Sequence, residues 1–190
     1  ATGSNSQITH RGIIEAQSTL VKDGKIYLVA GYQGEGVAPK SGSALIDGQL
    51  DVSAPTGGNG GFVETSAGLI KIGDQTRVIA TAPHGQNGLW LIDPQDFTIA
   101  ATGGDISGAT LSTNLATGNV TILSSSGANA GTGDINVNDN VSWSTNQLTL
   151  TAAKDININA LLSVTSSFSG TNGSLVLNTG TTNGADAGVA

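Results

Sequence analysis

The sequence predicts an all-β fold, namely a right-handed parallel β-helix (a solenoid) with about 20 residues per coil. Short alternating strand patterns, an unusual composition and an internal repeat lead to this prediction. Apolar residues recur at every second position in short runs, as in segments 26–29 and 148–150, and Gly, Asn, Asp or Ser bound these runs. Such alternation is typical of half-buried strands. No segment has a convincing helical periodicity, so no helix is expected.

The composition favours a fold rich in turns. The chain has 190 residues, of which 28 are Gly, and only 11% are charged. An average soluble domain has about 25% charged residues. A hydrophobic content of 37% in ordered short runs argues against disorder. We expect residues 1–190 to form a single β-helical segment. Because a stack of coils ends in unpaired strand edges, the segment is expected to be a fragment of a longer rod.

An internal repeat predicts how the coils stack. The segment 134–138, Asp-Ile-Asn-Val-Asn, recurs as Asp-Ile-Asn-Ile-Asn at 155–159. Repeats of about 20 residues built of short strands indicate a solenoid. Alternate residues then point inward and stack on their counterparts one coil away, while the Asn residues between them stack outside. The inward set is Ile135, Val137, Ile156 and Ile158, and the outward set is led by Asn136 and Asn157.

The repeat extends along the chain with changes of spacing. Leu148 and Leu150 match Leu175 and Leu177 at a longer spacing, which places an insertion in segment 166–172. A looser copy is expected to begin at Gly104-Asp105-Ile106, and its segment Val120-Thr121-Ile122 matches Leu148-Thr149-Leu150. Nine or so coils of this kind would form a rod roughly 40 Å long.

The charge and residue counts exclude several classes of function. The net charge is −7 with only seven Lys and Arg, so neither nucleic acid nor an anionic membrane is an expected partner. The absence of Cys excludes disulfides and thiolate metal sites. The apolar runs are too short for a membrane span, so no transmembrane helix is expected. No cofactor is predicted.

Motifs for metal binding are incomplete. Asp134-x-Asn136-x-Asn138 resembles the first ligands of an EF-hand loop, but the sixth position is Asp139 instead of Gly and the twelfth is Thr145 instead of Glu. Outward Asn ladders explain the pattern better, so no metal site is predicted.

Motifs for catalysis are weak as well. His10 and His84 are the only histidines, no Gly-x-Ser-x-Gly motif accompanies them, and His84 is expected at an exposed loop tip. The acid pairs that glycoside hydrolysis would need are Asp93 with Asp96 and Asp134 with Asp155. Because Asp commonly caps turns, these pairs are interpreted as structural. No catalytic residue is predicted, and the chain is not expected to be an enzyme.

Two neighbouring segments carry the most specific pattern. Segment 60–66 reads Gly-Gly-Phe-Val-Glu-Thr-Ser, and segment 88–99 reads Gly-Leu-Trp-Leu-Ile-Asp-Pro-Gln-Asp-Phe-Thr-Ile. We expect a turn with positive φ at the Gly pair, Phe62 in the core, a strand break at Asp93-Pro94, and a carboxylate bonded to a turn at Asp96. The signature residues are Gly60, Gly61, Phe62, Glu64, Trp90, Asp93, Pro94 and Asp96.

This pattern resembles the signature of filamentous haemagglutinin-like exoproteins that are exported by two-partner secretion. The resemblance covers roughly residues 10–180 and matches the β-helical region after the secretion domain. It implies a rod secreted from, or displayed on, a Gram-negative cell, together with an outer-membrane secretion partner. Members of the family serve as adhesins, as haemophore-like binders or as the stick of contact-dependent toxins.

The expected function is therefore a structural and adhesive rod that holds a binding region away from the cell. A host-cell surface glycan or protein is the expected receptor, and open strand edges would allow end-to-end self-association. Two alternatives remain open. The chain could be a carbohydrate-active β-helical enzyme, or a ligand-capturing module in which segment 31–40 or 54–59 grips a partner.

Overall fold

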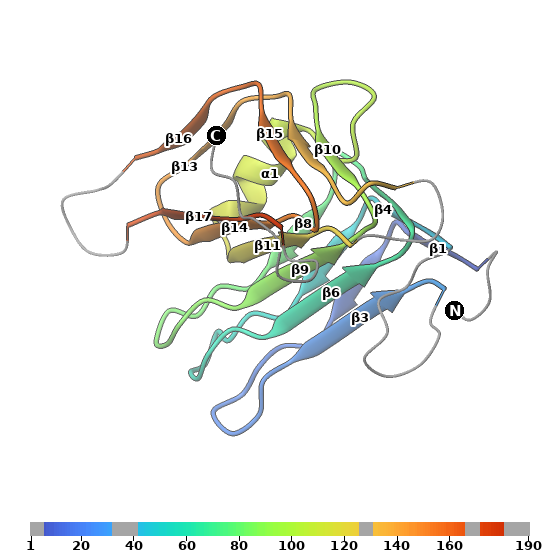
Figure 1. The fold of residues 1–190 in the computed structure, drawn as a ribbon. Coiled ribbons are helices and arrows are strands. Elements are labelled where there is room, and N and C mark those ends of the chain that lie inside the picture. Colours follow the sequence, from blue (N-terminus) through green and yellow to red (C-terminus); the bar gives the residue numbers. More distant parts are fainter. Residues whose placement is uncertain (1–5, 32–41, 126–130, 166–171, 181–190) are drawn as a thin grey trace.

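The computed structural model describes residues 6–31, 42–125, 131–165 and 172–180. Within these ranges the fold is all-β, with a single short helix among the strands (Figure 1). All pairings between the named strands are parallel, and the strands form five sheets. The prediction of an all-β class with parallel sheets is confirmed.

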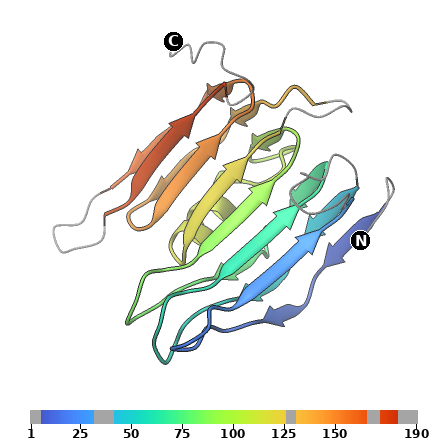
Figure 2. The same ribbon diagram turned by 60° about the horizontal axis from the view of Figure 1, so that its bottom comes forward.

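The largest sheet contains strands from residue 25 to residue 178 (Figure 2). Its six strands, in spatial order, are β3 (Lys25–Val29), β6 (Phe62–Ser66), β9 (Leu89–Asp93), β11 (Asn119–Leu123), β14 (Gln147–Thr151) and β17 (Ser174–Asn178).

The remaining strands form smaller sheets. One contains β1 (Gln7–His10), β4 (Ser43–Ile46) and β7 (Leu69–Ile72), and another contains β2 (Ile13–Glu15), β5 (Gln49–Asp51) and β8 (Arg77–Ile79). A third contains β10 (Phe97–Ile99), β12 (Ile135–Val137) and β15 (Ile156–Ile158), and the last pairs β13 (Val141–Trp143) with β16 (Leu162–Val164).

The strands return beside one another at irregular intervals along the chain. Lys25 pairs with Phe62, and Phe62 pairs in turn with Leu89 after a much shorter stretch of chain. Among the described strands, the shortest interval is 21 residues, as from Asn136 to Asn157, and it occurs only where β12 pairs with β15 and β13 pairs with β16. The prediction of about 20 residues per coil, and with it nine coils, is therefore wrong. The loops between strands vary in length, and the spacing of the Asp-Ile-Asn repeat is the shortest of these intervals.

One insertion falls where the sequence placed it. Asn157 follows its partner Asn136 by 21 residues, whereas Ser174 follows its partner Gln147 by 27 residues. Because β13 and β16 still have the shorter interval, the extra residues must lie between β16 and β17. Residues 166–171 lie outside the described ranges.

The core is built from the inward rows of the sheets. Ile92 and Val63 are fully buried, and Trp90 is 1% exposed. The indole nitrogen of Trp90 donates a hydrogen bond of 3.1 Å to the hydroxyl of Thr65, which satisfies a polar group that burial would otherwise leave unpaired. The buried hydroxyl of Thr65 therefore positions Trp90, the largest fully buried side chain.

The helix α1 (Gly108–Leu115) corrects the expectation that no helix occurs. It contacts β8 on one side and β13 on the other. Ser107 caps its first turn by accepting from the backbone of Thr110, and Leu111 and Leu115 are fully buried at the i, i+4 spacing that brings side chains to one face. So short a helix with small polar side chains gives too little pattern for periodicity to reveal.

The predicted looser copy is wrong at its start, Gly104-Asp105-Ile106, although its segment Val120-Thr121-Ile122 pairs in register with Leu148-Thr149-Leu150 as predicted. The strand beside Ile135 is β10, with Phe97 as its partner. Ile106 instead forms a bridge back to Ile99, and the Asp105 carboxylate accepts from the backbone nitrogen of Thr98 at 2.8 Å. This segment resembles the repeat in sequence because it also places one apolar residue inward after an Asp, but it folds back on β10.

The last described strands leave their inward side uncovered. Each inward residue there is more exposed than its partner one strand earlier, although the two are in register. Ile158 is 45% exposed against 0% for Val137, Val164 is 38% against 5% for Trp143, and Leu177 is 44% against 0% for Leu150. At this end, no described residue covers the apolar surface that neighbouring strands cover elsewhere.

Candidate binding groove

The glycines of the signature lie where successive passes of the chain approach closely. Neither Gly60 nor Gly61 has a positive φ, which corrects the expected turn. A Cβ on Gly61 would lie 2.1 Å from the carbonyl oxygen of Gly24, and one on Gly88 would lie 2.1 Å from that of Gly61. Glycine is therefore required for close backbone approach, and not for a left-handed conformation.

These glycines belong to a column at one corner of the fold. Each strand of the six-stranded sheet is preceded by a residue of this column, in the order Gly24, Gly61, Gly88, Gly118, Asn146 and Gly173. Asn146 departs from the pattern and has a φ of 67°. Its amide nitrogen donates to the carbonyl of Leu115 at 2.6 Å, which anchors it to the end of α1.

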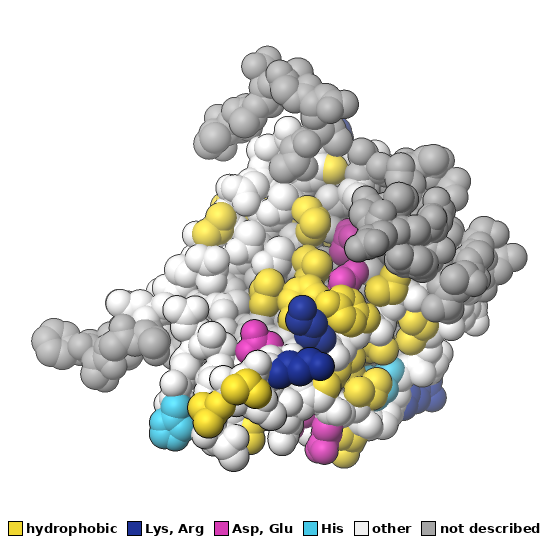
Figure 3. All heavy atoms as spheres, turned by 90° about the horizontal axis from the view of Figure 1, so that it is seen from below, with side chains coloured by type: hydrophobic (Ala, Val, Ile, Leu, Met, Phe, Trp, Pro, Cys, Tyr) yellow, Lys and Arg dark blue, Asp and Glu magenta, His cyan; other side chains and the backbone are white. Residues whose placement is uncertain are grey.

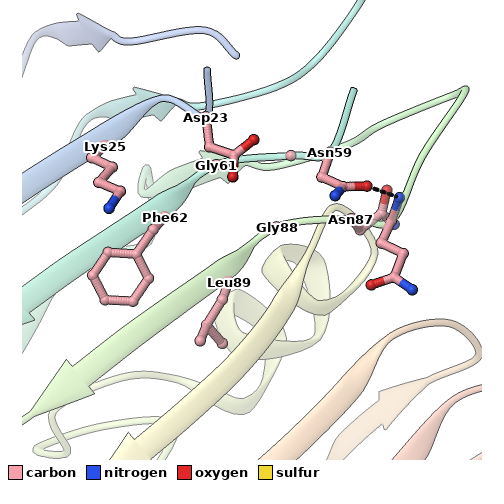
Figure 4. Close-up of a pocket in the computed structure, with 10 residues that line it drawn as sticks. Asp23, Lys25, Asn59, Gly61, Phe62, Asn87, Gly88 and Leu89 are labelled. Carbon is pink, nitrogen blue, oxygen red and sulfur yellow. Dashed lines mark hydrogen bonds between the residues drawn. The ribbon is translucent and has the colours of Figure 1, made fainter. Parts of the chain in front are cut away.

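Phe62 is half-buried on the outer face of the sheet, and the expectation that it fills the core is wrong. Because side chains alternate along a strand, the inward-facing positions of β6 are Val63 and Thr65. The Phe62 ring lies 5.8 Å from the ring of Tyr27 on the neighbouring strand. In Figure 4, Phe62 and Leu89 extend from adjacent strands on the same side of the sheet.

Two carboxylates share this outer face. Glu64 accepts a hydrogen bond of 2.7 Å from the hydroxyl of Ser66, and Ser66 is the cross-strand partner of Asp93. Burial, and then the charge of Glu64, raise the pKa of Asp93 to about 6. Asp93 is the last residue of β9, and the strand ends before Pro94.

Asp96 holds the turn that leads into β12. Its carboxylate accepts from the backbone nitrogens of Gly133 at 2.7 Å, Asp134 at 3.0 Å and Thr132 at 3.2 Å. The sequence suggested a bond from Asp96 to a turn, and the structure places that turn far along the chain, on the neighbouring pass. Asp93 and Asp96 thus lie in different surroundings.

The repeat residues stack as a ladder. Ile135 pairs with Ile156, and Asn136 pairs with Asn157. The Asn157 amide donates to the side-chain oxygen of Asn136 at 3.0 Å. Amides that bond to one another in this way stabilise the stack from outside. Among the described residues, no group of three or more His, Cys, Asp or Glu is placed to hold a metal ion.

The other predicted candidates do not gather at one site, although Asp134 and Asp155 lie at the start of this ladder, where the Asp134 carboxylate accepts from the backbone nitrogen of Asp155 at 3.2 Å. Asp134 and Asp155 are one strand apart and both lie within ion-pair distance of Lys154, at 3.7 and 3.1 Å. His10 is buried on β1 with a ring nitrogen 3.2 Å from the carbonyl oxygen of Gln49, whereas His84 is exposed in a loop. Each set has a structural partner or faces solvent.

A groove follows the glycine column across the sheet. It consists of a smaller hollow of about 290 Å³ and a larger hollow of about 720 Å³, and both are lined by Gln86 and Asn87. The smaller hollow lies over Lys25, Phe62 and Leu89, with Asn59 on its far wall (Figure 4). The larger hollow continues toward the start of β17 and is lined by Asn119, Asn146, Gln147, Asn172 and Ser174.

Hydrogen bonds fix several amides of the groove. Asn87 donates to the side-chain oxygen of Asn146 at 2.8 Å and accepts from the backbone of Ala82 at 2.8 Å. Asn119 accepts from the backbone nitrogen of Gln147 at 3.0 Å. Side chains held in this way keep one orientation before any ligand arrives.

Sequence reasoning missed this groove, although it proposed two excursions as elements that grip a partner. Segment 54–59 contains Gly57 and Gly58 at positive φ, and Asn59 at its end accepts from the backbone nitrogen of Gln86 at 2.9 Å. Asn59, the last residue of this excursion, therefore lines the groove. Of segment 31–40, residues 32–40 lie outside the described ranges. An Asn or Gln near the start of successive strands was the available signal, but only the register aligns these residues.

Comparisons with protein-family models, with curated proteins and with solved structures found no match. Among the described residues, no helix is long and apolar enough to cross a membrane.

Proposed function

We propose that the chain is a segment of right-handed parallel β-helix that serves as a structural and adhesive rod of an exported bacterial exoprotein. The proposal includes the surface location and the outer-membrane secretion partner that the resemblance to filamentous haemagglutinin-like proteins implies. The stacked register of the six-stranded sheet is the observation that carries it.

That register supports a stiff shaft. Along the sheet, inward residues such as Val63, Trp90, Val120 and Leu148 lie in successive paired positions. Every added strand repeats the same ladder of backbone hydrogen bonds and extends the same apolar row. Stiffness then arises from repetition and needs no special residue. The uncovered inward side of β15, β16 and β17 is what a segment of a longer stack would present.

Adhesion to surfaces tests the proposal. Beads coated with the purified chain are expected to adhere to host epithelial cells and to immobilised host glycans. Leu150→Asp places a charge in the fully buried inward row and is expected to abolish adhesion by unfolding the stack. Gln75→Ala, at an exposed turn between β7 and β8, is the matched control and should adhere like the native chain.

Two results would contradict the proposal. Failure of the folded chain to adhere to any of these surfaces would rule out the adhesive role. An experimental structure with turns of the opposite hand, or with sheets that do not enclose one core, would rule out the proposed architecture.

A second candidate, a carbohydrate-active enzyme, is favoured by the outer-face acids. Glycoside hydrolases use two carboxyl groups with different roles. One has a raised pKa and acts as the general acid, and the other acts as the carboxylate. Burial, and then the charge of Glu64, raise the pKa of Asp93 to about 6, which is the property expected of such an acid. Release of reducing ends from a polysaccharide panel, lost in both Asp93→Asn and Glu64→Gln, would favour catalysis over adhesion.

A further inference from the structure

We propose that the groove along the glycine column binds an extended, uncharged oligosaccharide. This inference names the ligand class for the proposed adhesive function and rests on it. The groove brings together the first residue of every strand in the six-stranded sheet, from Lys25 to Ser174.

The chemistry of the larger hollow selects an uncharged ligand. Six primary amides line it, and its remaining side chains are small, apolar or hydroxylic, with no charged group among the lining residues. A charged ligand would lose hydration there without meeting an opposite charge, which is unfavourable. Amides offer both donors and acceptors, which match sugar hydroxyls that also do both.

The smaller hollow, whose lining also includes the oppositely charged Asp23 and Lys25, supplies an apolar surface next to those amides. The half-buried Phe62 and Leu89 side chains lie side by side in it (Figure 4), and Tyr27, 55% exposed, contacts Phe62. Hydrophobic side chains also gather in the middle of the surface seen from below, close to Lys or Arg side chains (Figure 3). A pyranose ring has one face of C–H groups, which packs against such a surface while its hydroxyls point to the amides.

The length of the groove favours a chain of sugars over a single one. Its lining residues belong to all six strands of the sheet, so it crosses five strand spacings. At about 4.8 Å for each spacing, the groove is about 24 Å long. The amides of Asn87, Asn119 and Asn146 are already fixed by hydrogen bonds, which lowers the ordering cost of binding.

Titration calorimetry of the full chain with defined hexasaccharides tests the inference. Cellohexaose, maltohexaose and chitohexaose are the uncharged probes, and a sulfated hexasaccharide is the charged probe. At least one uncharged probe is expected to bind, and more tightly than the charged one. The double variant Gln86→Ala with Gln147→Ala, which removes two exposed amides of the groove, should weaken binding by about tenfold or more.

Controls keep the result interpretable. Phe62→Ala removes the apolar surface without touching the core and should also weaken binding, whereas Gln75→Ala removes an exposed amide outside the groove and should not. Circular dichroism checks that each variant is folded. Binding of none of the uncharged probes, preference for the sulfated probe, or native affinity in both groove variants would overturn the inference.

The outcome is separable from that of the proposed function. A chain that adheres to host surfaces but binds no uncharged hexasaccharide contradicts only the ligand class. A chain that binds a hexasaccharide in solution but fails to adhere when displayed on beads contradicts the adhesive role and leaves the groove assignment in place.

Discussion

The side chain of Asn114 in α1 makes hydrogen bonds to the backbone at the start of β8, at Val78 and Thr76, as a neighbouring strand would. The side-chain oxygen of Asn114 accepts a hydrogen bond of 2.6 Å from the backbone nitrogen of Val78, and its amide nitrogen donates to the carbonyl of Thr76 at 3.2 Å. One amide thus supplies the acceptor and the donor that a neighbouring strand would provide. On the other side of the helix, the hydroxyl of Ser112 accepts from the backbone nitrogen of Ser142 at 3.0 Å. These bonds let a helix occupy a place between two sheets.

Asn114→Ala is expected to lower the free energy of unfolding by about 2 kcal/mol, because it leaves the buried N–H of Val78 without a partner. Thr113→Ala, on the exposed side of the same helix, should change it by less than about 0.5 kcal/mol. Urea unfolding followed by circular dichroism measures both. Equal effects of the two substitutions would mean that Asn114 does not replace a strand.

Gly61→Ala is expected to be destabilising by about 2–3 kcal/mol, because the new Cβ would press on the carbonyl oxygen of Gly24 in the adjacent pass. Gly12→Ala is the matched control: a Cβ there meets nothing within 4 Å, so its effect should be close to zero. Thermal unfolding of the two variants compares them directly. A Gly61→Ala variant as stable as the native chain would contradict the role of close backbone approach in the column.

Leu150→Ala and Leu177→Ala compare two leucines that pair in register on adjacent strands. Leu150 is fully buried, so its truncation should cost about 3 kcal/mol, whereas Leu177 is 44% exposed and should cost about 1 kcal/mol or less. Denaturant titration measures the two costs. Similar losses at both positions would indicate that the inward side of β17 is covered in solution.

Asp93 makes stability depend on pH in the direction opposite to that of most carboxylates. Its folded-state pKa, about 6, lies above the ordinary value, so the folded chain binds the extra proton between about pH 4 and pH 6. Stability should therefore fall as the pH rises through this window and should gain nothing more below it. After allowance for partial exposure, the change is about 1–2 kcal/mol.

Asp93→Asn should remove this pH dependence and raise the unfolding free energy near pH 7, since the amide carries no charge to desolvate. Urea midpoints at pH 4.5, 6 and 7.5 for the two chains provide the measurement. A native chain whose stability rises from pH 4.5 to 7.5 by a margin that Asp93→Asn does not alter would show that Asp93 has no such effect.

Alternation and the repeat predicted the strands well, because both are local properties of the chain. The pairing of Ile135 with Ile156 and of Leu148 with Leu175 could be inferred from the similarity of the repeated sequence segments. The short period of the Asp-Ile-Asn repeat did not extend to the other strands, because loops of unequal length separate them. The groove could not be predicted, since its lining residues come from six strands and from the loops before them, and only the folded sheet brings these side chains to one surface.

By itself, the sequence determined that short parallel strands would stack and that apolar and polar residues would alternate along them. The tertiary structure decided which alternate set faces the core. On β6 it placed Val63 inside and Phe62 outside, against the expectation from size. It also placed α1 between β8 and β13. A side-chain period of two divides a strand into two faces, but only the packing of the sheets around a common core assigns the inner one.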